Sequence, residues 1–380
     1  MTGFVLSPET RWQRFIEPLP LDNGAVLPGF ELAYRSWGRL SAERDNAVVV
    51  CHALTGTADA DEWWGPLFGP GRALDPAHDY IVCSNALGGC YGSSGPASRA
   101  PDGRPWGARF PTVTVRDQVR AQMRLADSLG IRRIKLVIGG SMGGLQALEW
   151  AVLDSERVEA IASVAASARH SPWCIAWSEA QRMALAADPK YQDGHYEPDD
   201  PPVAGLAAAR AMAMIGYRSP ASLAQRFGRV GSDAGGDFAV AAWLRHHGDA
   251  LVRRFDANSY RLLLDVLDSH DVAHGRGELA QVLGAVGQPA LIVSIDSDAL
   301  YVPEDQRHLA DLLAQAEFVS IDSQFGHDGF LIDAKRLEPL VRSFRARLAK
   351  RAEDRRTGVN DVSLYSIAIA DFAVCRRTNF

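Results

Sequence analysis

One stretch of the chain combines residue types that can perform nucleophilic chemistry. Residues 135–150 run from an apolar, β-branched segment through a glycine-flanked serine into a helix-forming segment. The pattern Gly139-x-Ser141-x-Gly143 is typical of a nucleophile elbow, in which a tight strand-to-helix turn exposes the serine hydroxyl. Glycines suit this turn because the serine backbone is strained and the flanking strand and helix pass too closely for side chains. We therefore predict that Ser141 is a nucleophile.

The same glycine-rich turn has a plainer interpretation, in which it binds a phosphate or has only a structural role. A P-loop is excluded because no Lys-Ser or Lys-Thr pair follows the glycines. A dinucleotide-binding fingerprint requires a glycine at the position of Ser141. The nucleophile is favoured because strand and helix patterns flank the serine on the correct sides.

A serine of this kind needs an acid and a histidine base later in the chain, in the order Ser, Asp, His. His327 follows the last predicted strand, residues 317–321, in a loop of small and polar residues, and we predict that it is the base. The acid is expected where the preceding strand ends, and Asp296 and Asp298 are both candidates there. Asp298 is preferred because it lies further into the loop, from which a carboxylate can reach the imidazole.

The composition is that of an ordinary globular protein. Its 380 residues are 47% hydrophobic and 23% charged, enough for one large domain or two smaller ones. A net charge of -6 gives no reason to expect nucleic acid or an anionic membrane as partner, and no apolar run is long enough to span a bilayer. The N-terminal residues lack a basic region followed by an apolar core, so we expect no signal peptide.

The five cysteines are irregularly spaced, and none lies in a Cys-x-x-Cys pair. This pattern favours reduced thiols in a cytoplasm. No grouping of histidine and cysteine has the spacing of metal ligands, so we expect no metal site.

Strand patterns alternate with helix patterns over much of the chain, which predicts a mostly parallel sheet with right-handed crossovers. A first hairpin is predicted at residues 24–36, with its turn at residues 27–29. From residue 169 to about residue 285 the pattern becomes helical, which predicts a lid over Ser141. The other predicted elements are strands at residues 46–51, 79–84, 158–165 and 289–294 and helices at residues 114–129 and 334–350.

Arg210 lies in residues 205–214, an otherwise apolar helical segment of this lid. A buried arginine needs an anionic partner, because an unpaired buried charge is costly. A salt bridge within the lid and a clamp for a substrate carboxylate both satisfy this requirement, and the residues alone leave both open.

Eight short motifs along the chain carry a further signal: His52-Ala-Leu-Thr-Gly56, Asn85-Ala-Leu-Gly-Gly-Cys90, Gly92-Ser-Ser-Gly-Pro96, Gly140-Ser-Met-Gly-Gly144, Tyr217-Arg-Ser219, Arg226-Phe-Gly-Arg229, Phe255-Asp-Ala-Asn-Ser-Tyr260 and Gly326-His-Asp328. In these motifs the chain resembles the homoserine O-acyltransferases of methionine biosynthesis, a branch of the α/β-hydrolase fold, from about residue 12 to residue 348. We therefore predict an α/β-hydrolase core at residues 12–168 and 286–350 and a helical lid at residues 169–285. Residues 351–380 form a C-terminal extension of unknown role, outside the resemblance.

The resemblance implies acyl transfer from acyl-coenzyme A to the hydroxyl of homoserine in two steps. Ser141 would attack the thioester, with His327 as base and Asp298 orienting the imidazole. The backbone N–H groups of Leu54 and Met142 would hold the oxyanion. No cofactor is implied beyond the acetyl-CoA co-substrate, and a homodimer built through the lid helices is expected.

The resemblance also assigns residues to the acceptor and to the acyl group. Arg210 matches the family's arginine for the homoserine carboxylate, and Asp328 matches the acid that holds its ammonium group. Relatives that use succinyl share an arginine two residues after the triad aspartate, whereas Leu300 stands here and favours acetyl. The residues expected to form the wall of the acyl pocket depart from the commoner family sequence. Ala299 replaces a tryptophan, and residues 301–302 replace a Phe-Pro pair.

Other interpretations remain open at this stage. Succinyl-CoA is the alternative donor, and serine is the alternative acceptor, because a pocket discriminates one methylene by only about 1–3 kcal/mol. An ester hydrolase would use the same serine with water, although the pair of Arg210 and Asp328 argues for a zwitterionic acceptor. A non-catalytic binding protein is disfavoured, because all three triad residue types occur in the expected order.

Overall fold

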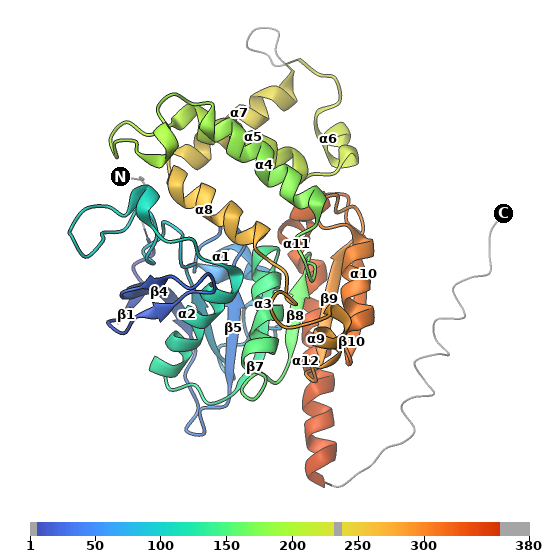
Figure 1. Ribbon diagram of the computed structural model, residues 1–380. Helices are drawn as coiled ribbons and strands as arrows, with labels where there is room; N and C mark the ends of the chain where they lie inside the picture. Colours follow the sequence, from blue (N-terminus) through green and yellow to red (C-terminus); the bar gives the residue numbers. More distant parts are fainter. Residues whose placement is uncertain (1–5, 232–237, 358–380) are drawn as a thin grey trace, which may run out of the picture.

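The computed structural model describes residues 6–231 and 238–357, and an eight-stranded sheet forms its centre (Figure 1). The strands lie in the order β1-β4-β6-β5-β7-β8-β9-β10. Neighbouring strands from β6 to β10 are parallel, whereas β1, β4 and β6 pair antiparallel. The strands are β1 (Arg11–Phe15), β4 (Phe30–Trp37), β5 (Ala47–Cys51), β6 (Tyr80–Ser84), β7 (Ile134–Gly140), β8 (Ile161–Val164), β9 (Ala290–Ile295) and β10 (Ala316–Ile321).

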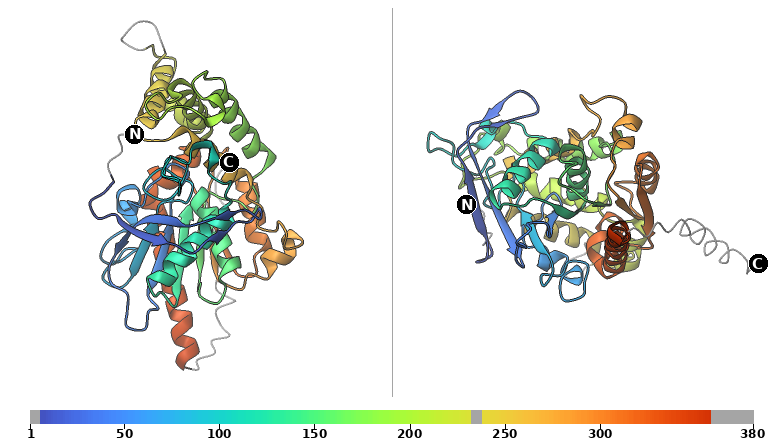
Figure 2. Two further views of the ribbon diagram at one scale, coloured as in Figure 1. Left: turned by 60° about the vertical axis from the view of Figure 1, so that its left-hand side comes forward. Right: turned by 90° about the horizontal axis from the view of Figure 1, so that it is seen from below.

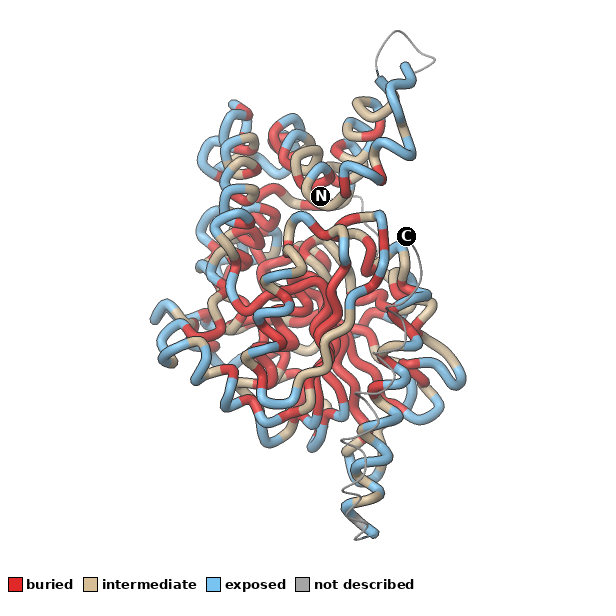
Figure 3. Tube along the Cα trace, turned by 90° about the vertical axis from the view of Figure 1, so that its right-hand side faces the viewer, coloured by how far each residue is buried: buried red, intermediate tan, exposed pale blue. Residues whose placement is uncertain are grey.

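Helices cover both faces of this sheet, which confirms the predicted mostly parallel α/β architecture. Strands β5, β6 and β9 are buried along their whole length, as expected for parallel strands packed on both sides (Figure 3). Because successive side chains alternate, Val49 belongs to the apolar core on one face and Val50 to the core on the other. The first core packs against α2 (Val115–Ser128), α3 (Met142–Leu153) and α10 (Pro303–Leu312), and the second against α1 (Ala60–Trp63) and α12 (Ala334–Thr357).

The segment between β8 and β9 forms a layer of helices above the carboxyl ends of the parallel strands (Figures 1 and 2). The predicted lid limits, residues 169 and 285, fall in the connections from β8 and to β9. The last helix of the segment, α9, packs against α10 beside the sheet and not in the layer above it (Figure 1). The helices are α4 (Pro172–Ala186), α5 (Val203–Gly216), α6 (Pro220–Phe227), α7 (Ala239–Val252), α8 (Ala257–Asp268) and α9 (Leu279–Gly284).

The predicted hairpin at residues 24–36 is wrong. The short strand β3 (Val26–Leu27) pairs with β2 (Leu19–Pro20), whereas β4 pairs with β1 and β6. In this register Phe15 lies opposite Phe30, and the two rings stack with centroids 4.6 Å apart. Burial of this aromatic pair favours β1 as the partner of β4. The turn signal at residues 27–29 is local and does not report this contact between distant residues.

The C-terminal helix α12 continues past the predicted end at residue 350 to Thr357. The rest of the predicted extension, including its apolar segment at residues 362–374, lies outside the described residues. A short helix, α11 (Gly329–Ile332), precedes α12, and single 3-10 turns lie at Gly65–Leu67, Gly107–Arg109, Gln192–Gly194 and Gly326–Asp328.

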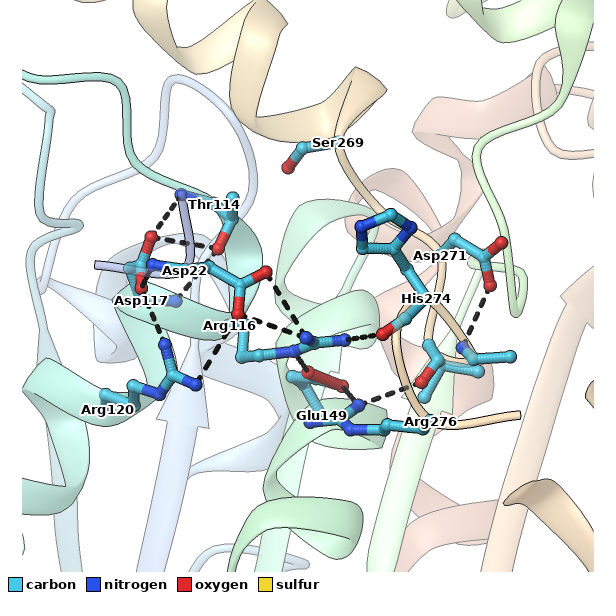
Figure 4. Close-up of polar contacts among 12 residues, drawn as sticks. Asp22, Thr114, Arg116, Asp117, Arg120, Glu149, Ser269, Asp271, His274 and Arg276 are labelled. Carbon is cyan, nitrogen blue, oxygen red and sulfur yellow. Dashed lines mark hydrogen bonds and ion pairs between the residues drawn. The ribbon is translucent and has the colours of Figure 1, made fainter. Parts of the chain in front are cut away.

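A buried ionic network anchors the helix α3 that follows Ser141 (Figure 4). Glu149 of α3 is 2% exposed, and its two oxygens accept hydrogen bonds from Arg116 at 2.8 Å and Arg276 at 2.7 Å. Arg116 also pairs with Asp22 at 3.0 Å. Because each charge in this set has an opposite partner, the network ties α3 to α2 and to the chain returning from the lid.

Within the described residues, no helix is long and apolar enough to cross a membrane. Among those same residues, no group of three or more histidine, cysteine or acidic side chains is arranged to hold a metal ion. Four cysteines, Cys51, Cys83, Cys90 and Cys174, lie in the described part of the chain, and all four are free thiols.

Candidate active site

Ser141 occupies a strained turn between β7 and α3. Its φ is 56°, a backbone region that costs a residue with a side chain on the order of 1–3 kcal/mol. Its N–H donates to the carbonyl oxygen of Val164 at 2.9 Å. A Cβ at Gly139 would lie 2.2 Å from the carbonyl oxygen of Gly143, and a Cβ at Gly143 would lie 2.0 Å from that of Cys51. Neither glycine can therefore carry a side chain, in agreement with the sequence pattern.

The three predicted triad side chains meet in one hydrogen-bonded chain. Nε2 of His327 lies 2.8 Å from Oγ of Ser141, and Nδ1 lies 2.7 Å from Oδ2 of Asp298. All three side chains are buried. The second carboxylate oxygen, Oδ1, accepts the N–H groups of Leu300 at 2.8 Å and Tyr301 at 3.0 Å, which fixes the orientation of the acid.

The electrostatic surroundings of His327 suit a base. Burial lowers the pKa of its imidazole, but the charge of Asp298 and the hydrogen bond to it outweigh burial, so the pKa is raised. With the proton on Nδ1 held by the carboxylate, Nε2 is free to accept a proton from Ser141. The rings of Tyr217 and Phe330 lie 5.7 Å and 5.5 Å from the imidazole, centroid to centroid, and limit the access of water to it.

Two backbone N–H groups near Ser141 are available for an oxyanion. Met142 is the first residue of α3, and Leu54 lies in the loop after β5. Neither N–H donates to an acceptor within residues 6–231 and 238–357, although both residues are buried. Because buried N–H groups normally have partners, these two are suited to a ligand oxygen. The positive end of the α3 dipole adds to the attraction for an anion.

A cavity of about 360 Å³ opens above the triad between the core and the lid. Ser141 and His327 line it from the core, and Arg210 of α5 and Arg254, just after α7, line it from the lid. Asp328 contributes a carboxylate to the same wall. The cavity therefore brings both signs of charge close to the nucleophile.

Arg210 forms no ion pair within 4.0 Å in the described part of the chain, so no salt bridge inside the lid accounts for it there. Its guanidinium lies 5.5 Å from the centroid of the Tyr217 ring and lines the cavity. Asp328 has a different neighbour: its Oδ2 lies 3.0 Å from Nε of Arg218, although this N–H does not point at the oxygen. Burial raises the pKa of Asp328, and the charges of Arg218, His327 and Arg210 oppose that rise.

The sequence reasoning assigned no role to Arg218 or Arg254. Arg218 lies inside a motif that carried the resemblance, and Arg254 immediately precedes another, so proximity to those motifs was the available signal. Their contacts depend on how the lid sits on the core, which local patterns do not encode.

A second, smaller pocket of about 30 Å³ lies beside Ser141, and Leu300 forms part of its wall. Its described lining contains no lysine, arginine, aspartate or glutamate. Burial first, and then the charges of His270 and Arg182, lower the pKa of the lining residue His170 to about 3, so its ring is neutral near pH 7. The pocket is thus small and uncharged.

The chain is similar to known proteins in sequence and in fold. A family model described as alpha/beta hydrolase fold matches residues 46–334. A homoserine O-acetyltransferase of Trichormus variabilis is 51% identical over 345 residues, which cover 90% of this chain and 96% of that protein. The crystal structure of homoserine O-acetyltransferase from Bacillus anthracis has a TM-score of 0.83 at 25% identity and covers 89% of this chain and 98% of its own. The crystal structure of esterase E22 has the same TM-score and identity, and covers 89% and 99% of the two chains. The chain therefore belongs to the homoserine O-acetyltransferase family and has the α/β-hydrolase fold.

Proposed function

We propose that this chain transfers an acetyl group from acetyl-CoA to the hydroxyl of L-homoserine through a covalent intermediate on Ser141. The hydrogen-bonded chain of Ser141, His327 and Asp298 beneath a cavity with both signs of charge carries this proposal. The names of the relatives support the acceptor and the acyl group. No cofactor or metal takes part in the proposed steps.

In the first half-reaction, Oγ of Ser141 attacks the thioester carbonyl carbon while Nε2 of His327 takes the hydroxyl proton. The carbonyl oxygen becomes an oxyanion, and the N–H groups of Leu54 and Met142 stabilise it. The carbon–sulfur bond then breaks, the imidazolium returns the proton to sulfur, and coenzyme A leaves. Asp298 stabilises the imidazolium and keeps the proton on Nδ1 throughout.

In the second half-reaction, homoserine occupies the cavity that coenzyme A has left. Its carboxylate pairs with Arg210, and its ammonium group pairs with Asp328. Its hydroxyl attacks the acetyl carbon while His327 takes the proton, and the same two N–H groups stabilise the second oxyanion. The bond to Oγ of Ser141 then breaks, and His327 returns a proton to the serine.

The small pocket beside Ser141 supports acetyl over succinyl. A succinyl group carries a second carboxylate, which would need a cation or several donors to leave water. The pocket offers about 30 Å³ and no cation among its described lining residues. Leu300, part of its wall, stands at the position where the family resemblance implies an arginine in members that use succinyl. An uncharged two-carbon group matches this space.

The decisive experiment mixes the protein with acetyl-CoA or succinyl-CoA and measures the mass of the intact chain. Acetylation is expected only with acetyl-CoA, and it should be absent in Ser141→Ala. Adding L-homoserine should discharge the acyl-enzyme much faster than adding L-serine. If coenzyme A is released at the same rate with and without homoserine, the proposal is wrong.

Ester hydrolysis is the second candidate, because the solved structure of an esterase has a similar fold. It predicts that water discharges the acyl-enzyme as fast as homoserine does. Arg210 argues against it: its half-buried guanidinium lines the cavity and forms no ion pair with another described residue, and an ester with an uncharged alcohol would offer it no anion.

A homodimer and a place in methionine biosynthesis in the cytoplasm belong to the same proposal. Several lid residues expose apolar side chains, which suits burial against a second copy. Light scattering in solution tests the dimer, and rescue of a methionine auxotroph that lacks homoserine acylation tests the pathway. The free thiols of the described residues support a reducing compartment. The exposed lid residues include Met183, Val203 and Ile215.

A further inference from the structure

The loop that carries Leu54 is held from the core by His52. Nδ1 of His52 lies 2.8 Å from the carbonyl oxygen of Ala53, and Nε2 accepts the N–H of Ala86 at 3.0 Å. Because Nε2 accepts, Nδ1 must carry the proton and donate to Ala53. Burial lowers the pKa of His52, which keeps the ring neutral and this arrangement intact. His52 therefore holds, from the core side, the start of the turn whose first peptide carries the Leu54 N–H.

Beyond Leu54 the loop is held from the lid by Arg254. Nη1 of Arg254 donates to the carbonyl oxygen of Thr55 at 3.0 Å and also contacts the hydroxyl of Tyr91. Among the hydrogen bonds to residues 52–56 in the described ranges, this is the only one from a lid side chain. Residues 53–56 form a turn that the N–H of Gly56 closes on the carbonyl oxygen of Ala53 at 2.9 Å. The contact of Arg254 with Thr55 therefore holds the far end of the turn that presents the Leu54 N–H.

We propose that Arg254 is a positioning residue that aligns the Leu54 N–H with the oxyanion and makes this alignment depend on the seating of the lid. The inference rests on the proposed function, because it takes Leu54 as an oxyanion donor. It gives the lid a part in the chemistry: a lid that lifts from the core removes the Thr55 contact and loosens one of the two donors.

Positioning and substrate binding have different kinetic consequences, and Arg254 also lines the cavity. Both half-reactions place negative charge on the same oxygen, so loss of alignment slows both by the same factor. An arginine that binds one substrate affects only the half-reaction in which that substrate takes part, and it does so mainly through KM.

The test compares Arg254→Ala and Arg254→Lys with Arg253→Ala. Arg253 is the matched control, because its side chain is exposed and makes no ion pair or hydrogen bond within the part of the chain that the structure describes. The burst of p-nitrophenol from p-nitrophenyl acetate reports acylation without acetyl-CoA or homoserine, and decay of the acetyl-enzyme with homoserine reports transfer. Both rates should fall about ten- to hundredfold in Arg254→Ala, less than the roughly 10²–10³-fold loss from deleting a donor outright. Added guanidinium ions should restore part of both rates in that variant alone.

An unchanged acylation burst combined with a higher KM for acetyl-CoA or homoserine would overturn the proposal and make Arg254 a substrate ligand. Thermal unfolding shows whether each variant is folded. If Arg254→Ala does not fold, the same rates are compared in Arg254→Lys, which keeps the positive charge and most of the aliphatic side chain. If wild type is acetylated but does not transfer to homoserine, the proposed function fails, while the acylation comparison still decides the role of Arg254.

Discussion

The carboxylate of Asp298 lies 2.7 Å from Nδ1 of His327, whereas Asp296, two residues earlier, accepts a hydrogen bond from the backbone N–H of Ser323 at 2.9 Å. Two aspartates in one short loop thus have separate tasks. One orients the imidazole, and the other ties the loop after β9 to the loop after β10. This difference allows a matched pair of substitutions.

We predict that Asp298→Asn lowers kcat by about 10³–10⁴-fold. The asparagine oxygen can still accept from Leu300 and Tyr301, so the loop should keep its shape. Its amide group, however, donates to Nδ1 of His327 and forces the proton onto Nε2, where it blocks removal of the serine proton. Asp296→Asn is the control, because an amide oxygen still accepts from Ser323, and its kcat should stay within a few-fold of wild type. Equal losses in the two variants would show that loop structure and not the tautomer is at stake.

The contacts of the triad could be anticipated because each depends on local sequence and on a general rule. The glycines around Ser141 leave room only for a strand-to-helix turn, and late strands end in loops at the same edge of a parallel sheet as the elbow. That edge is where His327 and Asp298 had to lie. The choice between Asp296 and Asp298 needed only the reach of a carboxylate from its place in the loop.

The contacts between lid and core could not be anticipated in this way. Arg254 and Thr55 are 199 positions apart, and nothing in the sequence around either residue encodes their pairing. The same holds for the strand that pairs with β4. The turn signal at residues 27–29 did not predict it, because burial of Phe15 against Phe30 selects β1 as the partner. Long-range packing decides such pairings, and the local pattern of apolar and polar residues carries no information about it.

We predict that Leu300→Ala widens the range of uncharged acyl groups that the enzyme accepts. Removing the side chain enlarges the small pocket beside Ser141 without adding a cation. The ratio of kcat/KM for propionyl-CoA to that for acetyl-CoA should rise about tenfold, the scale on which a pocket discriminates one methylene. Succinyl-CoA should gain much less, because its carboxylate still finds no positive partner. A gain for succinyl-CoA equal to that for propionyl-CoA would contradict an uncharged pocket.

We predict that acylation by p-nitrophenyl acetate rises with pH through a single ionisation above 6.5, the ordinary pKa of histidine. The sign follows from the chemistry: the base works only when neutral, and burial is outweighed by Asp298, which stabilises the protonated ring and raises the pKa. In Asp298→Asn the midpoint of the pH profile of the residual activity should therefore lie at lower pH than in wild type. A midpoint that stays unchanged in this variant would mean that His327 is not the group being titrated.

We predict that Arg210→Gln weakens the acceptor step and leaves the donor step intact. Loss of a charge-assisted contact to the homoserine carboxylate should raise KM for homoserine about ten- to hundredfold, on the scale of about 1.5–3 kcal/mol for such hydrogen bonds. Formation of the acetyl-enzyme from acetyl-CoA should be unchanged, because that step contains no carboxylate near Arg210. The sharper measurement uses 3-amino-1-propanol, which is homoserine without its carboxylate: wild type should strongly prefer homoserine, and Arg210→Gln should use the two acceptors with similar kcat/KM. A variant that kept the wild-type preference would place the carboxylate elsewhere in the cavity, with Arg254 as the remaining arginine among its described lining residues.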